Sequence, residues 1–175
     1  VLFVYLRFNR QDQAAELDAF RDFADTSQAI NRSMNIRAQG DDLRVSIGVS
    51  RNGWDYLFPG AARPQELEEF KDLVNAETPS IAMPEGIGAD ADLFLHIRAK
   101  REAVVYEVAE QYRLSFKDFA RVVDETHGFR YLEGRAIIGF IDGTENPTGI
   151  DAPMWAEVGS EDPQFTGGSY AFAQK

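Results

Sequence analysis

The 175-residue sequence contains no cysteine and only two histidines, His96 and His127. Without cysteine, the chain has no disulfide, no thiolate nucleophile, no cysteine-ligated zinc and no iron–sulfur cluster. The two histidines form neither an HExxH nor a His-x-His pair, which argues against a histidine-rich metal site. We expect His96 to be a half-buried, satisfied residue of a strand and His127 to lie at a bend.

Basic residues and long apolar runs are also scarce. The chain has 18 basic against 29 acidic residues and a net charge of −11, which argues against a nucleic-acid partner. No run approaches the roughly 18 consecutive apolar residues that span a bilayer, so we expect no membrane segment. The chain starts at Val1 inside an expected strand and ends in a strand-like alternation at residues 169–173. We therefore expect a longer protein, with any targeting segment outside this sequence.

Hydrophobic residues make up 44% of the chain and include 13 phenylalanines, enough to fill a core. Apolar and aromatic patterning predicts strands at residues 1–8, 43–49, 94–99, 116–124, 129–132 and 136–141. Helical spacing predicts amphipathic helices over residues 11–30, with Asp12 as N-cap, and over residues 102–114. Shorter helical turns are expected at residues 52–60 and from Pro64, before an irregular connection at residues 78–90.

The order of the expected elements is strand, helix, strand, insertion, strand, helix, strand. This is the β-α-β-β-α-β order of a ferredoxin-like fold, an α+β fold in which an antiparallel sheet carries two helices on one face. We assign residues 1–135 to this domain and residues 136–150 to a loop. Residues 151–175 form a connection and the start of a second unit.

The most distinctive stretch lies at residues 139–147. An apolar run leads to Asp142, which has Gly139 before it and Gly143 after it. Glycines at these places permit a tight backbone path and the close approach of a flat group. A buried strand that ends in a carboxylate is a candidate site, although an Asp-Gly turn is the commoner cause of such a pattern. The run lacks the spacing and the closing glutamate of an EF-hand, which argues against calcium.

The nine residues Gly139-Phe140-Ile141-Asp142-Gly143-Thr144-Glu145-Asn146-Pro147 resemble the GxxDG signature of the dye-decolorizing peroxidases and its continuation. Residues 92–98, 127–131 and 167–170 also resemble that family, in the expected order. The resemblance is nearest to the bacterial, largely cytoplasmic members. It implies a haem b peroxidase built from two ferredoxin-like halves in tandem, of the dimeric α+β-barrel type, with this chain as the first half.

The resemblance also implies roles for individual residues. Asp142 would be the distal acid that moves a proton between the two oxygens of hydrogen peroxide. Gly143, Thr144, Glu145 and Asn146 would line the haem edge. The partners implied are hydrogen peroxide and small aromatic reductants such as dyes, phenols or porphyrins. We further expect a cytoplasmic protein that forms a homo-oligomer when full length, with an exported form left open by the chain's start.

No histidine or arginine follows Asp142 in this chain. In the family the proximal histidine and a distal arginine lie in the second half, so we expect no metal ligand here and no activity from the 175 residues alone. Two other functions stay open. One is a haem-binding or haem-delivery protein of the same fold without turnover. The other is an assembly domain whose acidic surface docks a partner.

Overall fold

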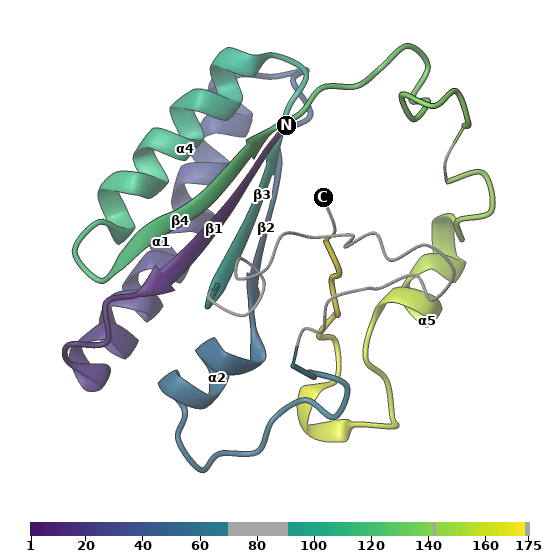
Figure 1. Cartoon of the computed structure of the whole chain (residues 1–175). Helices are drawn as coiled ribbons and strands as arrows, with labels where there is room; N and C mark the ends of the chain where they lie inside the picture. Colours follow the sequence, from purple (N-terminus) through teal and green to yellow (C-terminus); the bar gives the residue numbers. More distant parts are fainter. Residues whose placement is uncertain (70–90, 142, 174–175) are drawn as a thin grey trace.

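A computed structural model of the chain describes residues 1–69, 91–141 and 143–173 (Figure 1). The elements, in chain order, are β1 (Leu2–Phe8), α1 (Gln13–Arg37), β2 (Arg44–Val49), α2 (Arg51–Leu57), β3 (Leu93–Arg98), α4 (Glu102–Phe116), β4 (Ala120–His127), the 3-10 helix η1 (Gly149–Asp151), α5 (Ala152–Ala156) and the 3-10 helix η2 (Pro163–Phe165). Up to β4 this is the order that the sequence predicts, and α2 is the short helical turn expected at residues 52–60.

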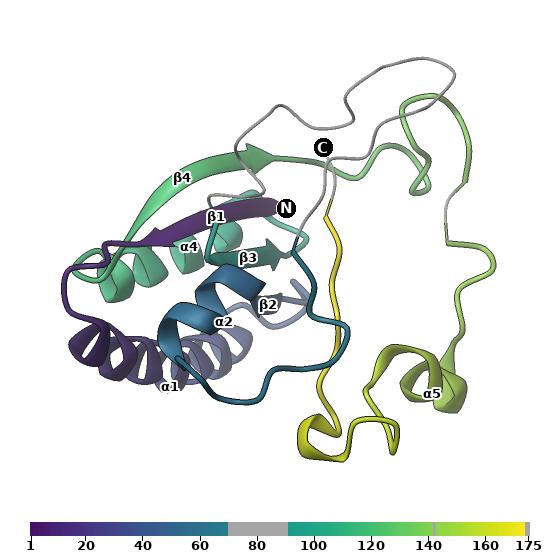
Figure 2. The same cartoon turned by 60° about the horizontal axis from the view of Figure 1, so that its bottom comes forward.

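Four strands form one antiparallel sheet in the order β2-β3-β1-β4. The central strand β1 pairs with β3, so that Leu2 lies opposite Ile97, and with β4, where the register shifts between Tyr5 and Leu6. Helices α1 and α4 lie side by side on one face of the sheet (Figures 1 and 2). The predicted fold class, an α+β ferredoxin-like sheet with its helices on one face, is confirmed.

The hydrophobic core lies between this sheet and the two helices. Every second residue of β1 and β3 is buried on the helix side: Leu2, Val4, Leu6, Phe8, Leu93, Leu95 and Ile97. Phe23 of α1 meets the ring of Tyr112 of α4 edge-on, with 5.3 Å between centroids. Full burial of one such side chain stabilises a fold by about 1.5–3 kcal/mol. The whole cluster of buried core residues falls between Leu2 and Ala120, so the four-stranded domain has its own core.

Local sequence explains where the long helices begin and end. The Asp12 carboxylate accepts a hydrogen bond from the Ala15 N–H at 3.1 Å, which confirms Asp12 as the N-cap of α1. Helix α1 continues seven residues past the predicted end at residue 30, because Met34 still lies on its buried face. Helix α4 begins at the predicted residue and ends two residues later than predicted.

Several predicted elements are wrong. Phe116 ends α4, and the following strand begins only at Ala120. Residues 129–132 and 136–141 form no strand; the structure shows only an isolated bridge between Arg135 and Ile141. Residues 64–69 are not helical; the rest of the short helix predicted from Pro64, like the irregular connection predicted at residues 78–90, lies outside the described residues. An apolar pattern indicates the capacity to form a strand, but a strand also needs a neighbour with free backbone groups.

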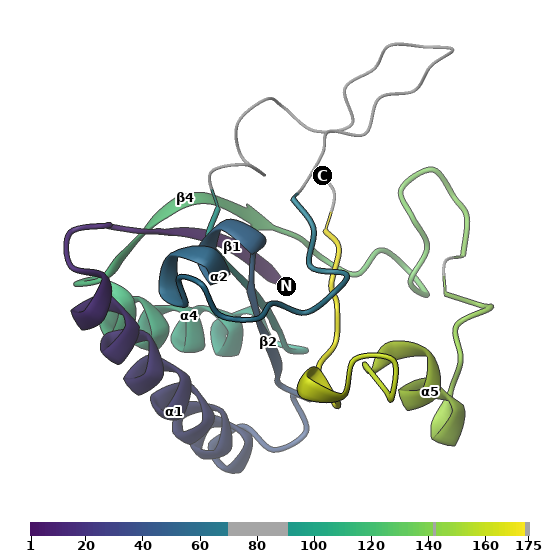
Figure 3. The same cartoon turned by 90° about the horizontal axis from the view of Figure 1, so that it is seen from below.

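Beyond β4 the chain leaves the sheet. Residues 129–141 and 143–157, which we call the arm, arch away from the sheet and include η1 and α5 (Figures 1 and 2). Residues 158–173, which we call the return segment, come back toward the domain (Figure 3). No helix in the described part of the chain is both long and apolar enough to cross a lipid bilayer. The domain boundaries at residues 135 and 150 stay a prediction.

Candidate functional site

The run that resembles the GxxDG signature lies in the arm, away from the four-stranded domain (Figure 1). The Ala136 N–H donates to the Phe140 carbonyl, and the Gly139 N–H donates to the Ala136 carbonyl, each at 2.8 Å. These two bonds close a tight turn. Gly139 and Gly143 have φ values of 101° and 79°, in the left-handed region that favours glycine. The backbone path therefore requires glycine at both positions.

Asp142, the predicted distal acid, lies outside the described residues. The other four predicted site residues, Gly143, Thr144, Glu145 and Asn146, are described, and all of them are exposed. The Asn146 N–H donates to the Gly143 carbonyl at 3.3 Å, so these four residues share one turn. A Cβ added at Gly143 would come within 3.1 Å of the Asn146 side-chain nitrogen, so a larger residue there would require the exposed Asn146 side chain to move.

The buried strand expected before Asp142 is wrong. Ile137, Ile138 and Phe140 expose 72%, 81% and 72% of their surface. The alternation of a buried strand is absent because no second layer of the described chain packs against this stretch. The chain segment that precedes the predicted acid is therefore an exposed apolar turn.

The two histidines lie elsewhere in the chain. The His96 imidazole stacks on the Phe3 ring with 4.6 Å between centroids, half-buried as predicted. Burial lowers the pKa of His96 most, and the positive charges of Arg98 and the N-terminus lower it further, so the imidazole is neutral at pH 7. His127, at the end of β4, is exposed, with its Nε2 3.8 Å from Glu125 Oε1.

Neither histidine belongs to the arm. Within the described residues, no group of three or more histidine, aspartate or glutamate side chains could hold a metal ion. The described part of the arm therefore presents exposed polar groups and a glycine turn, but no histidine that could bind iron.

The sheet face opposite the helices carries a cleft of about 370 Å³. It is lined by Phe3, Tyr5, Phe94, His96, Thr126 and, from the return segment, Ala171, Phe172 and Ala173. The Phe94 ring lies 5.3 Å from Tyr5 and 6.1 Å from Phe3, so the floor is aromatic. The sequence places Phe94, His96 and Arg98 on one face of a strand, but only the antiparallel register adds Phe3 and Tyr5. Sequence reasoning missed this surface for that reason.

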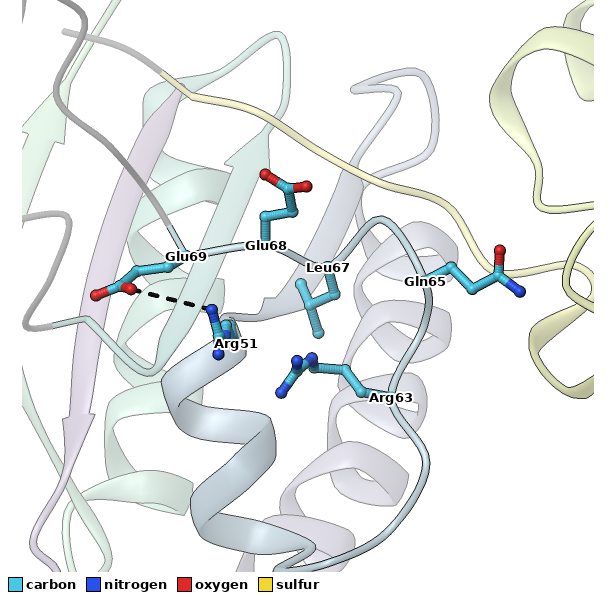
Figure 4. Close-up of a pocket in the computed structure, with 6 residues that line it drawn as sticks. All are labelled: Arg51, Arg63, Gln65, Leu67, Glu68 and Glu69. Atoms are coloured by element: carbon cyan, nitrogen blue, oxygen red, sulfur yellow. Dashed lines mark ion pairs between the residues drawn. The ribbon is translucent and has the colours of Figure 1, made fainter.

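A second cleft, of about 420 Å³, lies beside α2 and is lined by Arg51, Arg63, Gln65, Leu67, Glu68 and Glu69 (Figure 4). Arg63 Nη1 donates to both carboxylate oxygens of Asp55, at 2.7 and 2.8 Å. Arg51 Nη1 lies 3.9 Å from Glu69 Oε2 (Figure 4). Both guanidinium groups already have carboxylate partners, so this cleft is not an anion site.

A partly buried polar network joins the segments around α2. The Asp92 carboxylate accepts hydrogen bonds from the Phe8 N–H at 2.8 Å and from Arg10 Nη2 at 2.7 Å. The Arg10 guanidinium lies 4.5 Å from the centre of the Tyr56 ring, and the Tyr56 hydroxyl donates to Glu16 Oε2 at 3.0 Å. Burial, followed by the contact with Glu16, raises the pKa of Tyr56 to about 12. Tyr56 therefore stays a hydrogen-bond donor, and the network is structural.

In structural terms, the protein is an α+β protein with a ferredoxin-like domain, followed by a segment that contains a glycine turn. Residues 1–130 match the family model described as Dyp-type peroxidase, N-terminal, and residues 133–175 match the model described as Dyp-type peroxidase, C-terminal. The chain belongs to the Dyp-type peroxidase family.

Individual relatives agree with this assignment. The dye-decolorizing peroxidase of Rhodococcus erythropolis is 37% identical, over 94% of this chain and 46% of that protein. The crystal structure of a dye-decolorizing peroxidase from Bacteroides thetaiotaomicron covers 95% of this chain and 52% of that one, with a TM-score of 0.81 and 33% identity. A DypB variant from Rhodococcus jostii, in complex with heme, gives a TM-score of 0.80 and 32% identity over 95% of this chain and 51% of that one. The chain thus spans about half the length of the relatives it matches.

Proposed function

We propose that this chain supplies the distal-side loop of a haem peroxidase, which uses hydrogen peroxide to oxidise small aromatic reductants such as dyes, phenols or porphyrins. One observation carries the proposal: the match to both family models, in a chain that presents the run resembling GxxDG in an exposed turn. The curated relatives named dye-decolorizing peroxidases support it.

The turn suits the edge of haem b. Gly139 and Gly143 carry no Cβ, and the side chains of residues 144–146 are exposed, so a flat macrocycle can approach the backbone closely. We assign Gly143, Thr144, Glu145 and Asn146 to contacts with the haem edge. Bound haem supplies an iron centre that binds and activates peroxide. Neither His96 nor His127 is assigned as its ligand, which would come from the C-terminal portion that the longer relatives have.

Asp142 handles the proton in this proposal. As a carboxylate it accepts a proton from one oxygen of hydrogen peroxide, and as a carboxylic acid it returns that proton to the departing oxygen. The positive φ of Gly143, directly after it, fixes the backbone path at this point. Water is then the leaving group, in place of the much less stable hydroxide.

The test is Asp142→Asn in the full-length protein, with Asp151→Asn as the matched control. Asp151 is exposed and lies in the same arm, in η1. An amide cannot accept the proton, so we expect the rate of reaction with peroxide to fall about 10²–10⁴-fold in Asp142→Asn, with haem content unchanged. Stopped-flow absorbance measures the rate. An Asp142→Asn rate within threefold of the Asp151→Asn rate would contradict the role of Asp142.

The alternative, a haem-binding or haem-delivery protein, predicts a different result. Haem would bind, but dye oxidation would be absent in the unmodified protein and in both variants. The cytoplasmic location and the homo-oligomeric state stay predictions, tested by cell fractionation and by sedimentation of the full-length protein.

A further inference from the structure

Asn52 and Gly53 form the one Asn-Gly pair of the sequence, and the structure places both residues in α2. An Asn-Gly pair normally marks a turn, because both residues readily adopt a left-handed conformation. Here Gly53 is buried in a helix, and a Cβ at this position would lie 2.5 Å from the carbonyl oxygen of Asp92, the residue just before β3. This close contact requires glycine at residue 53, and it therefore leaves an asparagine directly before a glycine.

An Asn-Gly pair can lose ammonia without an enzyme, and asparagine is a thermolabile residue for this reason. The backbone nitrogen of Gly53 attacks the side-chain carbonyl carbon, Cγ, of Asn52, and a new C–N bond forms. The side-chain amide leaves as ammonia and takes the proton of the Gly53 N–H. Water then opens the cyclic imide at either of its carbonyl groups, which gives aspartate or isoaspartate. Glycine favours ring closure because it has no side chain to hinder the attacking nitrogen.

The folded α2 opposes this reaction in two ways. Ring closure needs a non-helical backbone at Asn52, whereas a helical residue has a ψ of about −40°. The attacking nitrogen is also engaged, because the Gly53 N–H donates to Ser50 Oγ at 3.1 Å in the N-cap of α2. The helix itself is held in place, since Leu57 at its end exposes only 1% of its surface. Asn52 can therefore react only when α2 leaves its position against the sheet.

We propose that Asn52 is a deamidation site gated by α2: it reacts when α2 opens, and its isoaspartate product prevents α2 from closing again. In isoaspartate the main chain runs through the side-chain carbonyl, so the backbone gains a methylene group between residues 52 and 53. The contact between Gly53 and Asp92 has no room even for a Cβ, and the lengthened backbone cannot restore it. Each such reaction converts a reversible local opening into a permanent one. The reaction involves neither haem nor peroxide.

The experiment incubates the full-length protein at mildly alkaline pH, with and without denaturing urea, and follows residue 52 by peptide mass spectrometry. The mass gained when a carboxyl group replaces the amide reports the reaction. Labelling with an isoaspartyl methyltransferase distinguishes isoaspartate from aspartate. We expect deamidation of Asn52 to be at least about tenfold slower in the folded protein than in urea, since it waits for a local opening. Equal rates in the two conditions overturn the proposal.

A pair of serine variants tests the role of α2 as the gate. Ser50→Ala removes the N-cap of α2, whereas Ser33→Ala changes an exposed serine of α1. We expect Ser50→Ala to speed deamidation of the folded protein about fivefold and Ser33→Ala to leave it within about twofold. In urea both variants should match the unmodified protein, because no cap is formed there. Equal rates for the two folded variants overturn the proposal.

Limited digestion with chymotrypsin tests the effect of the product. Chymotrypsin cleaves after aromatic residues, and Trp54 and Tyr56 of α2 are only partly exposed in the folded chain. After long incubation of the folded protein, we expect the molecules with isoaspartate at residue 52 to be cut in α2 first. Asn52→Gln, which keeps the amide but disfavours the cyclic imide, should stay resistant over the same time. Isoaspartate-containing protein as resistant as Asn52→Gln contradicts the permanent opening.

Discussion

Asp92 exposes only 2% of its surface, less than any other charged residue in the described part of the chain. A buried carboxylate costs free energy unless hydrogen bonds and an opposite charge compensate it. Here the Phe8 N–H supplies one hydrogen bond and Arg10 supplies another together with its charge. The side chain thereby joins the end of β1 to the start of β3.

At the residue scale we predict that Asp92→Ala strongly destabilises the domain. The change leaves the Phe8 N–H and the Arg10 guanidinium without their acceptor, so the free energy of unfolding should fall by roughly 3 kcal/mol. Urea unfolding followed by circular dichroism measures it. Asp18→Ala is the control, because Asp18 pairs with Arg21 at an exposed position. It should change stability by less than about 0.5 kcal/mol. Equal decreases in the free energy of unfolding of the two variants would show that the hydrogen bonds of Asp92 do not stabilise the domain.

At the residue scale, the sequence predicts only part of the candidate site. The order of Gly139, Asp142 and Gly143 indicates a turn with a carboxylate, and the positive φ of both glycines agrees with a turn. Whether residues 143–146 line a cofactor depends on which residues distant in the sequence lie near them in space. The local spacing of residues carries no information on such contacts. The aromatic floor formed by Phe3 and Phe94 was missed for the same reason, because it depends on strand register.

At the scale of elements, α2 and β3 meet at Gly53. A Cβ at Gly53 would lie 2.5 Å from the carbonyl oxygen of Asp92, the residue just before β3, so the helix and this backbone approach too closely for any other residue. The same carbonyl accepts a hydrogen bond from the Ser50 N–H at 2.9 Å, just before α2. The contact fixes how α2 sits against the sheet.

We predict that Gly53→Ala destabilises the protein by about 2 kcal/mol or more, since the clash outweighs the gain of about 1 kcal/mol that alanine brings to a helix. The matched control is Gly48→Ala in β2, where the nearest atom to an added Cβ lies at an ordinary 3.8 Å. Thermal unfolding of the two variants gives the comparison. A Gly53→Ala protein as stable as Gly48→Ala would disprove the close contact.

The sequence predicts well those elements whose buried face is visible in their own residue pattern. Alternation in β2, the two faces of β3 and helical spacing in α1 and α4 each reflect one face that packs on the core. These elements are confirmed within a few residues, apart from the longer C-terminal end of α1. Residues 136–141 have an equally apolar pattern, yet they form an exposed turn. Composition alone could not reveal this difference, since burial there needs a packing partner that the described chain does not provide.

At the scale of the whole molecule, the chain joins a domain that has its own hydrophobic core to an arm whose apolar side chains are exposed. The core cluster ends at Ala120, and the apolar residues of the arm lie outside it. The division between the two family models, between residues 130 and 133, falls close to the start of the arm. The domain is thus a scaffold that positions the arm, and the arm carries the residues proposed to meet haem.

The most direct test of the central claim is the visible absorption spectrum of the full-length protein with haem, recorded before and after one equivalent of hydrogen peroxide. The account predicts a Soret band from bound haem that changes within seconds of peroxide addition and recovers when a phenolic reductant is supplied. A full-length protein without a Soret band, or one whose Soret band does not respond to peroxide, would contradict it.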